Sequence, residues 1–66
     1  MLTVEEYERL LNIKEHVQMD ISSLEMLLLK FVANNKHDEY RETLQDIDNK
    51  KNDLNSLIDK YPELFI

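Results

Sequence analysis

Apolar side chains recur in the first half of the chain at spacings that alternate between three and four residues. The positions are Tyr7, Leu10, Lys14, Val17, Ile21, Leu24, Leu28 and Phe31, and only Lys14 among them is charged. This alternation is the seam of a coiled coil. It predicts a helix over residues 4–33, which a capping box of Thr3 with Glu6 begins and an asparagine pair at residues 34 and 35 ends.

The predicted first helix has one point at which it could break. Ser22 and Glu25 repeat the capping-box spacing, and a break near residues 20–23 would change the fold into a three-helix bundle. The seam nevertheless continues in the same phase through this segment, which contains neither Gly nor Pro. We therefore expect one continuous helix.

A second stripe of apolar positions predicts a helix over residues 38–61. Asp38 is a good capping residue, and Pro62 restricts the residue before it, so the helix should lie between them. The stripe consists of Tyr40, Leu44, Ile47, Lys51, Leu54, Ile58 and Tyr61. An apolar tail follows at residues 62–66.

The two stripes match each other in antiparallel register. If the chain folds back through a loop at residues 34–37, facing positions have a nearly constant sum of residue numbers, as for Leu24 with Ile47. The expected fold is therefore all-α, an antiparallel two-helix hairpin. Lys14 and Lys51 would pack by their aliphatic stems with their ammonium groups in water. The same register brings Phe65 of the tail to Tyr7.

The first helix carries more apolar residues than one partner helix can cover. Those outside the seam are Leu11, Ile13, Met19, Met26, Leu27, Leu29 and Val32. A helix that is apolar nearly all round is usually buried nearly all round, and a chain this short has little core of its own. We expect two hairpins to pair through their first helices into a four-helix bundle, as a homodimer or a tetramer. The alternative is that a different protein occupies this surface.

Composition narrows the possible functions. The chain has 66 residues, no Gly and no Cys, so it lacks phosphate-binding glycine loops, disulfides, thiolate nucleophiles and cysteine zinc sites. The net charge of −6 disfavours direct binding of nucleic acid. The longest apolar run is too short for a membrane span, and the first residues lack the pattern of a signal peptide. We expect a cytoplasmic protein without membrane contact.

The ionisable residues form no recognisable catalytic or metal site in the sequence. His16 and Asp20 share a helix face, but Ile13 stands where a carboxylate-bridged metal bundle would have glutamate. The serines and the two histidines are not brought together by the predicted register. We expect no cofactor, no metal and no enzymatic activity.

Carboxylates are numerous along the predicted second helix. They are Asp38, Glu39, Glu42, Asp46, Asp53 and Asp59. A row of carboxylates can imitate a phosphate backbone, which would make the chain an acidic antagonist of a DNA-binding protein. A solvated outer face explains the same charges, and the basic residues among them weaken the imitation.

Residues 53–61 resemble part of a known motif. Leu54, Leu57, Ile58 and Tyr61 match the hydrophobic positions in the second helix of the Spo0E-like sporulation phosphatases, which are small helical hairpins. The departures lie at polar positions of the motif, where this chain has Lys51, Asn52, Asp53 and Asn55. The resemblance implies a response-regulator phosphatase as a weaker alternative. The residue pattern itself favours a small acidic regulator or assembly factor that self-associates and binds another protein.

Overall fold

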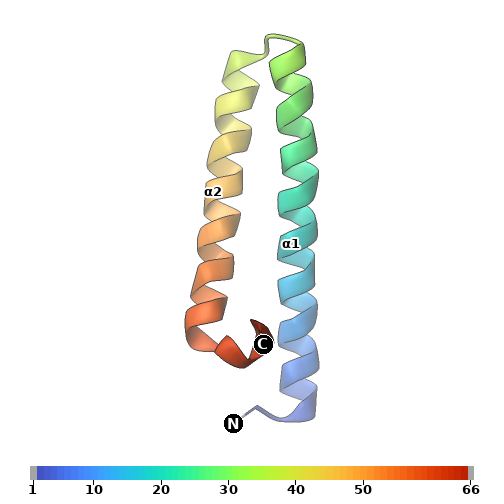
Figure 1. The fold of residues 1–66 in the computed structure, drawn as a ribbon, viewed down its shortest axis with the longest axis vertical. Coiled ribbons are helices and arrows are strands. Elements are labelled where there is room, and N and C mark those ends of the chain that lie inside the picture. Colours follow the sequence, from blue (N-terminus) through green and yellow to red (C-terminus); the bar gives the residue numbers. More distant parts are fainter. Residues whose placement is uncertain (1, 66) are drawn as a thin grey trace.

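Two long helices and one short helical turn make up the fold (Figure 1). The computed structural model describes residues 2–65. Helix α1 spans Val4–Ala33, helix α2 spans His37–Lys60, and the 3-10 helix η1 spans Pro62–Phe65. The long helices run antiparallel and side by side, in a rod of 48 × 16 × 16 Å. The predicted all-helical hairpin is confirmed, since the described residues form no strand.

Helix α1 begins at the predicted cap and has the predicted bounds. The Thr3 hydroxyl accepts a hydrogen bond of 3.1 Å from the backbone N–H of Glu6 and donates one of 3.1 Å to the Glu6 carboxylate. The helix then runs for 30 residues and is unbroken at residues 20–23. The alternative of a three-helix bundle is therefore wrong.

Thr3 provides a test of this helix start. We expect Thr3→Ala to lower the free energy of unfolding by about 1 kcal/mol, because a backbone N–H loses its acceptor. Thr3→Ser keeps the hydroxyl and should stay close to the parent chain. Urea unfolding followed by helicity measures both variants, and equal losses in the two would contradict the role given to the hydroxyl.

The turn between the helices is set by Asn35. This residue has a φ of 57°, in the left-handed region that asparagine tolerates better than most residues. The N–H of Asn35 donates to the carbonyl of Val32 at 3.2 Å, and the N–H of Lys36 donates to that of Phe31 at 2.8 Å. These two bonds form a Schellman motif, which ends α1 as the asparagine pair predicts.

Helix α2 begins and ends one residue earlier than predicted. Because the Schellman turn is complete at Lys36, α2 starts at His37, and the connection is residues 34–36. Asp38 is therefore not the cap; it lies in the first turn, where its charge opposes the positive end of the helix dipole. The capping position belongs to Lys36, whose side chain makes no capping hydrogen bond. At the other end, Tyr61 leaves the helix immediately before Pro62.

The α1 side of the interface follows the predicted seam. Leu10, Lys14, Val17, Ile21, Leu24, Leu28 and Phe31 are all buried or half-buried. Ile21 near the middle is the most buried of them, and Tyr7 at the open end is exposed, contrary to prediction. The seam is therefore an interhelical contact over most of the length of α1.

The α2 side is rotated from the predicted stripe. Its buried and half-buried positions are Tyr40, Thr43, Ile47, Lys50, Leu54, Leu57, Ile58 and Tyr61. Thr43 is buried, whereas Leu44 is exposed over 40% of its surface, so hydrophobicity alone selected the wrong neighbour. Lys50 similarly replaces Lys51, and it reaches Asp20 across the interface, with 3.5 Å between Nζ and Oδ2. With these corrections, the sum of residue numbers that pairs Leu24 with Ile47 also pairs Ile21 with Lys50 and Leu28 with Thr43.

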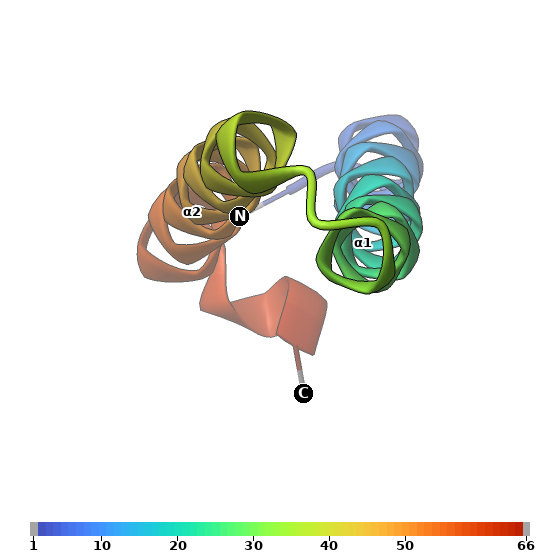
Figure 2. The same ribbon diagram turned by 90° about the horizontal axis from the view of Figure 1, so that it is seen from above.

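The 3-10 helix η1 closes one face of the hairpin near its open end (Figure 2). Leu64 is buried. The Lys14 ammonium group donates a hydrogen bond of 2.9 Å to the Leu64 carbonyl and lies 4.5 Å from the centre of the Phe65 ring. The sequence predicts neither contact: the half-buried Lys14 holds the tail by its ammonium group, and Phe65 has Lys14 as a neighbour. Ile66, the last residue of the predicted tail, lies outside the described residues.

Lys14 provides a test of how the tail is held. Lys14→Met keeps the aliphatic stem but removes the hydrogen bond to Leu64 and the cation–π interaction with Phe65. We expect the free energy of unfolding to fall by about 1–2 kcal/mol. The N–H of Leu64 donates to the Tyr61 carbonyl. Its amide exchange rate should increase by at least the factor that corresponds to this loss of free energy. Unchanged exchange there would show that Lys14 does not hold the tail.

Candidate interaction surfaces

The side of α1 that points away from α2 is apolar and exposed. Met19, Met26 and Leu29 are exposed over 66%, 66% and 73% of their surfaces. They lie about half a turn from the interhelical seam, so α2 cannot cover them. We call the positions Met19, Ser22, Met26, Leu29 and Ala33, all of them exposed, the outer face of α1.

The other predicted interface residues are spread around α1. Val32 is exposed between the seam and the outer face, four residues after Leu28 of the seam. Ile13 and Leu27 are exposed on the flank of the interhelical seam, each one heptad from Asp20. Leu11 is half-buried and contributes less free surface than the sequence predicts. The predicted residues therefore do not form one continuous patch, and the largest exposures gather on the outer face.

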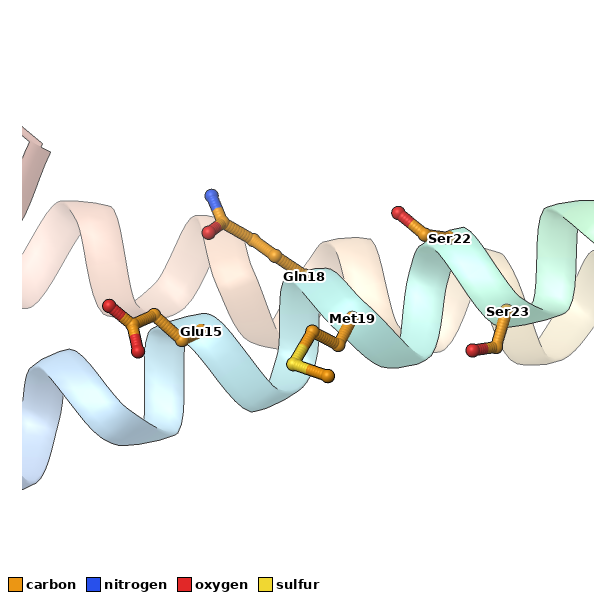
Figure 3. Close-up of a pocket in the computed structure, with 5 residues that line it drawn as sticks. All are labelled: Glu15, Gln18, Met19, Ser22 and Ser23. Carbon is orange, nitrogen blue, oxygen red and sulfur yellow. The ribbon is translucent and has the colours of Figure 1, made fainter.

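A shallow hollow interrupts the outer face (Figure 3). Its lining residues all project from α1 and are Glu15, Gln18, Met19, Ser22 and Ser23. The hollow exists because the serine side chains are short, while Met19 and Gln18 beside them are long. In the sequence the serines indicate a possible helix break, or nucleophiles without a histidine partner, and neither interpretation predicts this hollow. The spacing of three and four residues between Met19, Ser22 and Met26 is the signal that reveals it.

The predicted acidic residues are all exposed, but they divide between two faces of α2. Glu39, Glu42, Asp46 and Asp53 follow one flank at spacings of three, four and seven residues. Asp38 and Asp59 lie on the outer side of the helix, three heptads apart. The six carboxylates therefore do not form the single row that the sequence suggests.

A second hollow lies between the helices on the acidic flank. Asp20 and Ser23 of α1 and Asp46, Asn49 and Asp53 of α2 line it, together with Lys50 and Leu24. Lys50 pairs with Asp20 there, while Asp46 and Asp53 lie one turn to either side of Lys50 on α2. This flank can receive basic groups, although Lys50 already neutralises part of its charge.

The open end of the hairpin has a third hollow, which was not predicted from the sequence. Leu2, Thr3, Val4, Tyr7 and Glu63 line it. It brings the first residues of α1 beside η1. Val4 is exposed over 76% of its surface.

The described residues contain no group of three or more histidine, aspartate or glutamate side chains placed to hold a metal ion. His16 is exposed on α1, as predicted from the heptad. Between residues 2 and 65, neither long helix has an apolar stretch sufficient to cross a bilayer.

Comparisons of the chain with protein-family models, curated proteins and solved structures find no match. The structure does place the residues behind the resemblance at 53–61. Leu54, Leu57, Ile58 and Tyr61 are half-buried, and the polar residues among and before them are exposed. The matching positions are therefore those that pack the hairpin.

Proposed function

We propose that this chain is a small acidic interaction module that self-associates through the outer face of α1. The observation that carries the proposal is the exposure of Met19, Met26 and Leu29 on the side of α1 opposite α2. Large apolar side chains gathered on one helix face favour burial against another surface. Pairing of two copies there gives a four-helix arrangement with the α1 helices inside and the α2 helices outside.

The thin interior of the hairpin supports the same proposal. Among the described residues, the buried apolar side chains are Ile21, Ile47 and Leu64. A chain of this size gains little stability from its own core, and no cysteine is present to form a disulfide. Association would add buried apolar surface where the single hairpin has least. The biological role that follows is a cytoplasmic regulator or assembly factor that acts by binding another protein, with no catalysis of its own.

The test is the solution mass across a hundredfold range of concentration, with helicity recorded alongside. We expect a dimer or tetramer that keeps its helicity on dilution. A chain that is monomeric and fully helical throughout the range would contradict self-association. A dimer or tetramer that dissociates and loses helicity on dilution would instead show that association and folding are coupled.

The acidic flank of α2 supports a second candidate function, binding of a basic protein in place of DNA. The observation that favours it is the hollow that Asp46 and Asp53 share with Asp20. Binding of this kind should weaken as the salt concentration rises. It should also weaken in a double variant that combines Asp46→Asn with Asp53→Asn, because two carboxylates are then neutral. Asp38→Asn with Asp59→Asn removes the same charge from the outer side of α2 and is the matched control. Equal weakening in the two pairs would indicate an effect of net charge alone.

A further inference from the structure

The outer face of α1 repeats the spacing of a coiled-coil seam. Met19, Ser22, Met26, Leu29 and Ala33 follow one another at intervals of three, four, three and four residues. The same alternation produces the seam that α2 occupies on the other side of the helix. Helix α1 therefore has two seams, and only one of them has a partner within the hairpin. The inference that follows rests on the proposed self-association, and it specifies how the second seams of two copies would pack against each other.

The outer face contains both a projection and a hollow that fits it. Leu29 is the most exposed of the large apolar side chains on the outer face. The hollow lies beside Gln18, Met19 and Ser22, and Met19 is ten residues before Leu29 in the chain. In a coiled coil, an apolar side chain of one helix enters a space between four residues of the other, spaced i, i+3, i+4 and i+7. Glu15, Gln18, Met19 and Ser22 have that spacing.

We propose that a second copy of this chain covers the outer face, with the two α1 helices antiparallel and Leu29 of each copy in the hollow beside Met19 of the other. Under a two-fold axis this contact occurs twice. The same register places Met26 of each copy against Ser22 of the other. At the Met26–Ser22 layers a long side chain then faces a short one, which fills the space that Ser22 leaves.

The charges at the ends of the outer face fit this orientation. In this register Glu15 of one copy lies opposite Ala33 of the other, so it comes within about one helical turn along the axis of the other copy's Lys30. A parallel pair would place each of these residues against its counterpart in the other copy, so that like charges meet. Antiparallel packing also sets the two helix dipoles in opposition, which is favourable. The face is therefore complementary to itself in the antiparallel arrangement.

Cysteine cross-linking tests the register directly, because the parent chain contains no cysteine. An equimolar mixture of Met19→Cys and Leu29→Cys chains should form a disulfide between the two variants on mild oxidation. Ser22→Cys mixed with Met26→Cys is the second pair, and it changes the apolar surface less. Asn52→Cys on the exposed surface of α2 is the control for random collision. Peptide mass spectrometry identifies which positions are joined.

The outcomes separate the proposed register from the proposed function. Mixed disulfides in both pairs, well above the Asn52→Cys control, support the antiparallel register. A dimeric mass with disulfides mainly between identical positions, as in Met19→Cys alone, would indicate a parallel pair and overturn the register while leaving self-association intact. A monomeric mass of the parent chain, with cross-linking at the control level, would overturn both. Helicity of each variant is recorded first, so that an unfolded variant is recognised and the other pair decides.

Discussion

Replacing Ile47 with alanine should unfold most of the hairpin. Ile47 has 3% of its surface exposed and lies at the centre of α2, facing the seam of α1. Truncating a buried isoleucine to alanine costs about 2–5 kcal/mol. A chain of this size rarely gains more than about 3–5 kcal/mol from its own core, so the loss approaches the total stability. Urea and thermal unfolding at a fixed protein concentration, followed by helicity, measure the effect.

Leu44→Ala is the matched control for this prediction. Leu44 lies three residues before Ile47 on α2, is also aliphatic, and is exposed over 40% of its surface. Alanine is a good helix former, so we expect a change within about 0.5 kcal/mol. If Leu44→Ala is as damaging as Ile47→Ala, the observed rotation of α2 is wrong, and the stripe predicted from hydrophobicity is the correct one.

Leu29→Glu should dissociate the proposed dimer. The substitution removes the side chain that enters the hollow of the other copy and places a carboxylate in an apolar contact, a combination that costs about 2 kcal/mol or more per site. Because the two-fold axis repeats the site, the expected loss is roughly 4 kcal/mol, or roughly a thousandfold in Kd. Sedimentation at a series of concentrations measures it.

Val4→Glu is the matched control for Leu29→Glu. Val4 is exposed to a similar extent, but it lies in the first turn of α1 and outside the outer face. Val4→Glu adds the same negative charge as Leu29→Glu, at a helix start where acidic residues are favourable. It should leave the dimer intact, because Val4 is not part of the proposed interface. Dissociation by Val4→Glu alone would move the interface to the open end.

Leu27→Glu tests the flank of α1 beside Asp20. It should weaken association less than Leu29→Glu does, because Leu27 is less exposed.

The sequence predicts the backbone of this fold well because its signals are local. The capping box at Thr3 and the asparagine pair at Asn35 each define a helix end within a few residues, and the heptad fixes the face of α1 that meets α2. The choice between Thr43 and Leu44 could not be made in this way. Both positions suit a spacing of three and four, and burial of a threonine depends on the rotation of α2 against α1.

The interaction surfaces were predicted less completely. Apolar residues outside the seam are visible in the sequence, so Met19, Met26 and Leu29 were identified as candidates. Leu11 is half-buried. Its burial depends on the fold of the whole hairpin, and the residues next to it in the sequence do not indicate this burial. The hollow beside Ser22 depends on the absence of side-chain volume, which a search for apolar residues overlooks. The bond between Lys14 and the tail joins residues too distant in the chain for a local pattern to reveal.

The turn at Asn35 determines the order in which the hairpin can assemble. Phe31 and Tyr40, on either side of it, are nine residues apart in the chain, whereas Lys14 and Leu64 are separated by 50 residues. The entropy cost of closing a loop increases with its length, so pairing of the helices starts at the turn and proceeds toward the termini. Each pair that forms shortens the loop that the next pair must close. We therefore expect docking of η1 against Lys14 to be the final step of folding, and this end of the hairpin to be the first to open when the chain unfolds.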